Sequence, residues 1–164
     1  MTGFDITTPE WATIRPVAPG DMPALAALVA GLGAHHGDSV APDQGALARD
    51  VLGPAPWLRV LVAESSGALV GYAALCPRAQ LQFGLRGIDI HHLYVAPDAR
   101  GWGLGRRLID ACLDLATTLG CGFVTVDAAP ENRSAQAVYT ACGFERFDPD
   151  AARFRLRLPA RQGG

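Results

Sequence analysis

Apolar and polar residues alternate along this chain with two periods, one typical of strands and one typical of helices. Short apolar runs bounded by turn residues predict seven β-strands, at residues 11–17, 57–65, 68–76, 87–97, 122–129, 144–147 and 152–159. Apolar residues spaced three and four apart predict about four helices. The first follows Asp21, and the other three cover residues 43–52, 101–120 and 131–143. This order predicts an α/β fold with a mixed sheet, flanked by the helices and containing one parallel β-α-β unit.

The composition agrees with one globular domain and excludes several classes of function. A chain of 164 residues that is 49% apolar suits a single domain over residues 1–164, with its core between about 11 and 159. A net charge of −2 argues against a nucleic-acid partner. All 14 basic residues are arginine, which excludes a Schiff-base lysine and a Walker A lysine.

The cysteines and the apolar runs bear on the cellular compartment. The four cysteines have no C-x-x-C spacing, so we expect free thiols, no bound metal and a reducing environment. No apolar run reaches 18 residues and the first residues lack a signal-peptide pattern. We therefore expect a cytoplasmic protein with no membrane partner.

The glycine-rich stretch at residues 96–107, APDARGWGLGRR, is the most informative part of the chain. It lies between a predicted strand and a predicted helix, where unpaired backbone N–H groups and the helix dipole attract anions. Gly101, Gly103 and Gly105 allow a ligand to approach the backbone closely, and Arg100 and Arg106 add positive charge. The stretch predicts a site for a phosphate or a pyrophosphate.

Three known phosphate loops compete for this assignment. A Walker A loop needs a lysine, and a dinucleotide loop needs a third glycine where Arg106 stands. A methyltransferase-type G-x-G-x-G loop does fit the three glycines, and Asp127 ends the next predicted strand, where a ribose-binding acid would lie. Such a loop follows the first strand of a large parallel sheet, however, and this one comes too late in the chain.

Two motifs in this order resemble the GNAT superfamily of N-acetyltransferases. The stretch LYVAPDARGWGLGRRLI is similar to its acetyl-CoA-binding motif, and residues 132–144 match a second motif, N-x-x-A-x-x-x-Y-x-x-x-G-F. The resemblance implies a sheet whose fourth and fifth strands separate, with acetyl-CoA between them and its pyrophosphate on the loop. The residues it assigns to the cofactor are Leu93, Val95, Arg100, Gly101, Trp102, Gly103, Leu104, Gly105, Arg106, Asn132, Ala135 and Tyr139.

The resemblance also implies the catalytic parts. The backbone N–H of Leu93 would polarise the thioester carbonyl, and Tyr139 would protonate the departing CoA thiolate. Strand alternation predicts that Asp89 and His91 share one face, while His92 lies on the other. Counted back from the loop, Asp89 and His91 match positions where other members of the family carry a catalytic glutamate or a histidine pair. The resemblance therefore makes these two residues the candidate general bases.

Residues near the presumed acceptor are His35, His36, His92 and Asp127. The stretch at 78–95 resembles the diamine and polyamine branch of the family, but His91 and His92 replace the acidic pair of that branch. We expect transfer to a primary amine of a small molecule, which leaves monoamines, amino acids and amino sugars open. A protein or peptide acceptor, or a non-catalytic acyl-CoA sensor, is the alternative. The arginine-rich run at 153–158 predicts either a homodimer contact or a solvated edge strand.

Overall fold

The computed structural model describes residues 11–39, 41–146 and 156–157, and these form a sheet with helices on both faces. The sheet has five strands in the order β1-β2-β3-β4-β5. Their bounds are β1 Thr13–Pro16, β2 Arg59–Ser65, β3 Ala68–Gln80, β4 Leu85–Val95 and β5 Phe123–Val126. Neighbouring strands are antiparallel except β4 and β5, which are parallel. The predicted mixed sheet and its parallel β-α-β unit are therefore confirmed.

The two strands predicted near the end of the chain do not form in the described residues. No strand forms at residues 144–146, and residues 156 and 157 are exposed and also lie outside any strand. The remainder of the predicted strands at 144–147 and 152–159 lies outside the described part of the chain.

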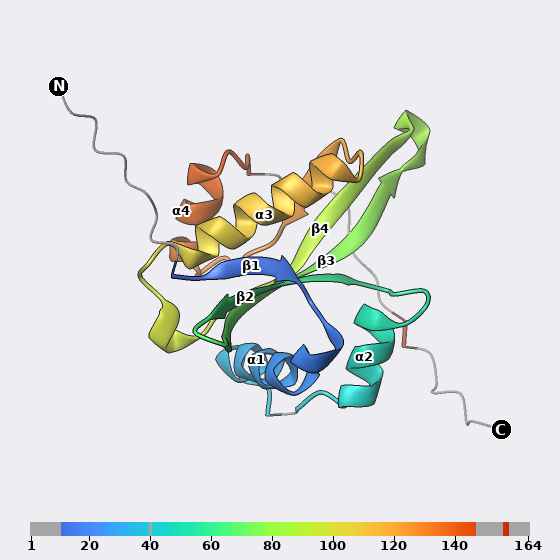
Figure 1. The fold of residues 1–164 in the computed structure, drawn as a ribbon. Helices are drawn as coiled ribbons and strands as arrows, with labels where there is room; N and C mark the ends of the chain where they lie inside the picture. The colour runs from blue at the N-terminus through green and yellow to red at the C-terminus, as the bar shows by residue number, and fades with distance from the viewer. Residues whose placement is uncertain (1–10, 40, 147–155, 158–164) are drawn as a thin grey trace.

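Four α-helices cover the sheet, two on each face (Figure 1). They are α1 Met22–His35 and α2 Gln44–Leu52 on one face, and α3 Leu104–Thr118 and α4 Arg133–Ala141 on the other. Three short 3₁₀ turns accompany them, η1 Pro19–Asp21, η2 Leu81–Phe83 and η3 Pro97–Ala99. No helix in the described part of the chain is long and apolar enough to cross a membrane.

Local sequence explains where these helices begin and end. The Asp43 carboxylate accepts the Ala46 N–H at 3.0 Å and caps the start of α2. Gly120 (φ +72°) lies two residues beyond the end of α3, and Gly143 (φ +92°) lies two beyond the end of α4. A left-handed glycine at this position ends a helix without the steric cost that a side chain would add.

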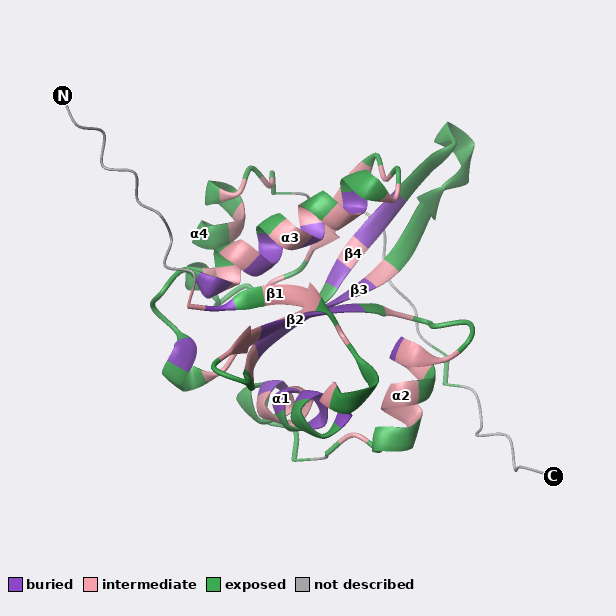
Figure 2. Cartoon of the chain, viewed as in Figure 1, coloured by how far each residue is buried: buried purple, intermediate pink, exposed green. Residues whose placement is uncertain are grey.

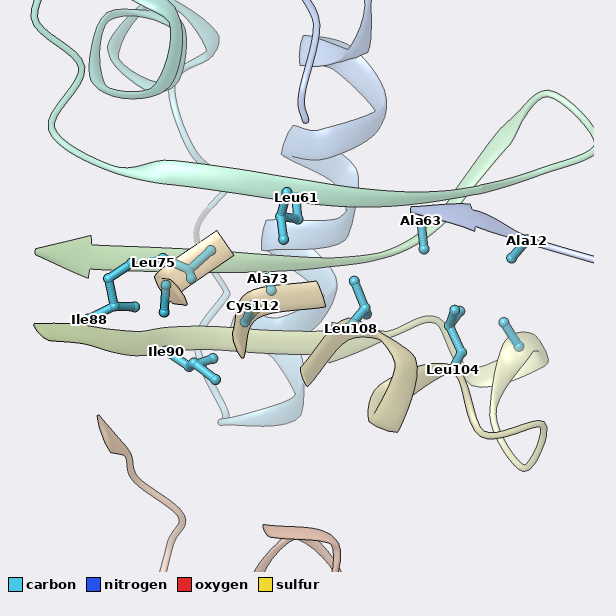
Figure 3. Packing of buried hydrophobic residues seen from close by; sticks show 12 residues of the cluster. Ala12, Leu61, Ala63, Ala73, Leu75, Ile88, Ile90, Leu104, Leu108 and Cys112 are labelled. Carbon is cyan, nitrogen blue, oxygen red and sulfur yellow. The ribbon is translucent and has the colours of Figure 1, made fainter. Parts of the chain in front are cut away.

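Each face of the sheet buries its own apolar cluster (Figure 2), and Figure 3 shows the cluster on the α3 face. On the α3 face, Leu104, Leu108 and Cys112 pack against Leu75, Ile88 and Ile90 of the sheet. On the α1 face, the buried residues are Met22, Leu25, Leu28, Leu32, Val51, Val60, Val62, Tyr72, Ala74 and Tyr94. Burial of these side chains, at about 1.5–3 kcal/mol each, holds both helical layers to the sheet.

Strands β4 and β5 pair over a short stretch only. Their register runs from Gly87 beside Phe123 to Ile90 beside Val126, where β5 ends, while β4 continues to Val95. Among the described residues, the second half of β4 therefore has β3 on one edge and no strand on the other. The predicted separation of these two strands is observed, and it opens the space described below.

A glycine allows β4 and β5 to approach closely where they do pair. A Cβ atom built at Gly87 would collide with the Phe123 ring. We expect Gly87→Ala to lower the free energy of unfolding by about 1–3 kcal/mol, because the overpacked ring must shift. Urea unfolding followed by circular dichroism measures the change.

The control is Gly20→Ala, since a Cβ atom there meets nothing within 4 Å. This variant should change stability by less than about 0.5 kcal/mol. Equal losses in the two variants would contradict the close packing of Gly87 against Phe123.

Candidate active site

A cleft of about 970 Å³ lies where β4 and β5 separate. This volume is in the range that holds a cofactor-sized ligand. Four parts of the chain line it: the end of α1 with the loop after it, the second half of β4, the glycine-rich loop with the start of α3, and α4 with the loop before it. Residues far apart in the sequence, such as His36, Gly103 and Tyr139, therefore face one space.

The glycine-rich loop presents bare backbone to this cleft. Gly101 (φ +84°) and Gly103 (φ +77°) are left-handed, and a Cβ atom at either would meet nothing within 4 Å. The first bond of α3 runs from the Arg107 N–H to the Gly103 carbonyl at 3.2 Å. Helix geometry then leaves the N–H groups of Leu104, Gly105 and Arg106 at the open end. The predicted anion site is thus a set of amides beside empty space.

The exposed edge of β4 continues this row of amides. The Ala96 N–H donates to the Val70 carbonyl on the β3 side at 2.8 Å, whereas the Val95 carbonyl accepts from Arg100 Nε at 2.8 Å and so points away from β3. Backbone groups of alternate residues point to the same edge of a strand. The N–H groups of Val95 and Leu93 therefore point to the edge that β5 has left.

The arginine that precedes the glycines fixes the loop. Besides its bond to Val95, the Arg100 guanidinium lies 5.5 Å from the centre of the Tyr94 ring, a cation–π contact. Arg100 and Arg106, which the resemblance assigns to the cofactor, both line the cleft. Trp102 does not: its side chain is 64% exposed and lies outside the residues that line the cleft.

Helix α4 contributes the predicted asparagine, alanine and tyrosine. Asn132 Oδ1 accepts the Ala135 N–H at 3.1 Å, so this side chain caps the helix while it faces the cleft. Tyr139 also lines the cleft and contacts Phe144. Burial raises the pKa of the Tyr139 phenol, and the nearby charge of Asp127 raises it further. Tyr139 therefore keeps its proton at neutral pH and can donate it.

The positions of His91 and His92 differ from the prediction, made from strand alternation, that they lie on opposite faces of the strand. Leu75 of β3 pairs with Ile90, while the preceding Ala74 pairs with His92, so His91 is the extra residue of a β-bulge. The bulge shifts the alternation, and both histidines line the cleft with their rings stacked at 4.4 Å and 14°. His91 and His92 are thus neighbours instead of lying on opposite faces.

Asp89 lies apart from the other predicted catalytic residues. Its Oδ1 accepts the Thr125 hydroxyl at 2.5 Å and lies 4.0 Å from an Arg78 nitrogen. It is not among the residues that line the cleft. The structure therefore brings His91 and Tyr139 to one cleft, with Asp89 engaged elsewhere.

A buried tyrosine that sequence reasoning missed supports the histidine pair. The Tyr72 side chain is 1% exposed, and its hydroxyl lies 3.0 Å from His92 Nδ1. Burial lowers the pKa of His92 to about 4, and the neighbouring His91 and His36 lower it as well. Burial also raises the pKa of Tyr72. Both groups are therefore neutral at pH 7. No motif marks Tyr72, because its role depends on pairing between β3 and β4.

The remaining predicted acceptor residues, His35, His36 and Asp127, also line the cleft. Asp38 joins them from the loop after α1 and was not predicted. Its N–H donates to the Gly33 carbonyl at 2.8 Å, which holds the loop against the end of the helix. Within the described residues, no group of three or more histidine, cysteine or acidic side chains is arranged to hold a metal ion.

Comparison with known proteins shows which family has this fold and site. The profile of the acetyltransferase (GNAT) family matches residues 34–144, more than half of the chain. The chain is 31% identical over 102 residues to the uncharacterized N-acetyltransferase YhfO of Bacillus subtilis, an alignment that covers 62% of this chain and 68% of YhfO. The chain therefore belongs to the GNAT acetyltransferase family and is an acyltransferase.

Other relatives extend this comparison. The mycothiol acetyltransferase of Sanguibacter keddieii is 35% identical over 161 residues, which cover 88% of this chain and 50% of that protein. The chain spans about half the length of that relative. The solved structure of the aminoglycoside acetyltransferase AAC(6')-Iy with a CoA-linked bisubstrate analogue superposes with a TM-score of 0.73 at 26% identity, and covers 90% of this chain and 99% of its own.

The low pKa of His92 predicts how the imidazole and the fold respond to acid. The C–H resonances of the His92 ring should stay at their neutral positions from pH 8 to pH 5 and move only near pH 4. Because the folded pKa lies below the usual 6.5, the unfolded chain takes up this proton first. Stability from this group is therefore present above about pH 6.5 and is lost as pH falls toward 4.

NMR titration of the histidine rings measures the first effect, and thermal unfolding between pH 7 and pH 4 measures the second. His92→Gln, which carries no titrating ring, should lose less stability over this range. A titration midpoint near pH 6.5 for the ring resonances of His92 would contradict the burial of this side chain against Tyr72.

Proposed function

We propose that the protein transfers the acetyl group of acetyl-CoA to a primary amine of a small molecule, by direct attack while both substrates are bound. One observation carries this proposal: the unpaired amides of β4 and of the first turn of α3 face the same cleft as Tyr139 and His91. An extended ligand with a phosphate group at one end and a reactive carbonyl at the other would use both sets of amides.

The residues present fit acetyl-CoA. The pyrophosphate would bind the N–H groups of Leu104, Gly105 and Arg106, in the space that a side chain at Gly103 would fill. The pantetheine arm would pair with the Val95 backbone along the edge of β4, much as an added strand would. Binding energy from this remote part positions the acetyl group for reaction.

At the reacting end, the Leu93 N–H would donate to the thioester oxygen as negative charge develops on it. The acceptor amine must lose a proton before it attacks the carbonyl carbon. We assign this proton to His91, directly or through water, because His91 lines the cleft whereas Asp89 does not. The new C–N bond forms as the C–S bond breaks, and the electron pair leaves on the CoA sulfur.

Tyr139 would return a proton to this sulfur. Its raised pKa keeps the phenol protonated until a basic thiolate forms nearby. One proton passes from the ammonium group to His91 before the attack, and one passes from Tyr139 to the CoA sulfur. The attacking nitrogen loses its second proton to solvent as the amide forms. Solvent then restores both groups.

Loss of the Tyr139 hydroxyl tests this step. We expect Tyr139→Phe to lower kcat about 100-fold, the usual scale for lost acid catalysis, while acetyl-CoA binding stays within about twofold. Turnover is followed by release of the free CoA thiol with the best amine from a screen, and binding by calorimetry. Unchanged turnover would remove Tyr139 from the mechanism.

A substitution at Gly103 tests the cofactor site. Gly103→Val should reduce acetyl-CoA affinity by about 100-fold or more, since its side chain occupies the space before α3 and its φ of +77° disfavours a branched residue. Gly120→Val is the matched control: Gly120 has a similar φ of +72° and open surroundings, but lies at the far end of α3.

The control should lose stability and retain acetyl-CoA affinity in calorimetric titrations. Equal affinities of the two variants and the wild type would refute the loop assignment. Tight binding without turnover of any amine would instead favour a non-catalytic sensor of acyl-CoA.

A further inference from the structure

Positively and negatively charged side chains lie on different walls of the cleft. Arg100 and Arg106 are its permanent cations among the described lining residues, and both belong to the glycine-rich loop or the first turn of α3. Arg100 is engaged by the Val95 carbonyl and the Tyr94 ring. The positive charge therefore belongs to the end where a phosphate group would bind.

Two carboxylates lie on other walls of the cleft. Asp38 lies in the loop after α1, and Asp127 directly follows β5, near enough to Tyr139 to raise its pKa. The 14-residue helix α1 also ends at this loop, and its carboxyl end carries the negative side of the helix dipole. Each of these features favours a cation at the acceptor side.

Imidazole rings also line the cleft, and they carry no permanent charge. His91 and His92 stack on each other, and His36 lies close enough to His92 to disfavour its protonation. The groups that the structure shows beside His92 are Tyr72, His91 and His36. None of these is an arginine, so the described residues beside His92 offer no permanent counter-charge to a carboxylate on the acceptor.

We propose, on the basis of the function assigned above, that the acceptor is a cationic amine without a carboxylate next to the amino group. The acceptor end of the cleft offers Asp38 and Asp127 to the ammonium group and imidazole rings to the rest of the molecule. An α-amino acid would place its carboxylate beside these same acidic groups, which repel it and leave it unpaired. Amines of the decarboxylated type are therefore selected over the parent amino acids.

Matched pairs of substrates test this selection: histamine against histidine, and tyramine against tyrosine. The methyl ester of each amino acid is a third member, because it keeps the size of the parent and loses the negative charge. Release of CoA thiol is measured at pH 8 with saturating acetyl-CoA. We expect kcat/KM for each amine to exceed that of its amino acid by at least about tenfold, and the ester to recover most of the difference.

Two variants test whether Asp38 causes the preference for the amine over the amino acid. Asp38→Asn keeps the backbone bond to Gly33 and should narrow the gap between amine and amino acid by at least about threefold. Asp114→Asn removes a charge from an exposed position of α3 outside the cleft and should leave the gap unchanged.

An amino acid that reacts as well as its amine, or a gap that Asp38→Asn leaves intact, would overturn the proposed acceptor class while acetyl transfer itself stands. Acetyl-CoA binding without thiol release from any member would overturn the proposed function and this selection with it.

Discussion

The early end of pairing between β4 and β5 is the constraint on which the site depends. Backbone N–H groups away from water need a partner, and a strand normally finds it in the next strand. Here β5 ends at Val126, opposite Ile90, so the amides of Leu93 and Val95 keep an open edge. The start of α3 adds the amides of its first turn to the same cleft. The fold thus presents a row of backbone hydrogen-bond donors to the cleft, and no side chain is needed to form it.

The packing around this opening explains why it is stable. Gly87 lets β4 contact β5 closely where they pair, and two apolar clusters hold α1 and α3 to opposite faces of the sheet. The bulge at His91 comes directly after the last pair of β4 with β5. It shifts the alternation, so that Leu93 packs with the α3 cluster while Tyr94 is buried in the α1 cluster.

Much of this architecture could be predicted from local patterns. The helical period and Gly120 predicted the helix that became α3, and the glycine spacing predicted the left-handed backbone turn at its start. The Asn132 cap and the position of Tyr139 on α4 also follow from short-range spacing. Such features depend on residues within one or two turns, so the sequence alone contains enough information to place them.

The features of the site that depend on pairing between strands could not be predicted from the local sequence. The bulge at His91 is visible only in the register of β3 against β4, and it places His92 against Tyr72, 20 residues earlier in the chain. Asp89 accepts the Thr125 hydroxyl from the neighbouring strand and lies outside the residues that line the cleft, and neither fact is visible in the local sequence. Asp38 carries no motif, because its role comes from how α1 ends beside the cleft.

Titration of the ¹⁵N-labelled protein with CoA, followed by backbone amide shifts, tests the central claim most directly. The account predicts that the largest shifts fall on Leu93, Val95, Leu104, Gly105 and Arg106, in one saturable process. Tyr94, whose N–H points toward β3 by the same alternation, should shift less than its two neighbours. The absence of saturable shifts, or shifts concentrated on the β3–β4 hairpin tip around Phe83, would show that the open edge of β4 is not the cofactor site.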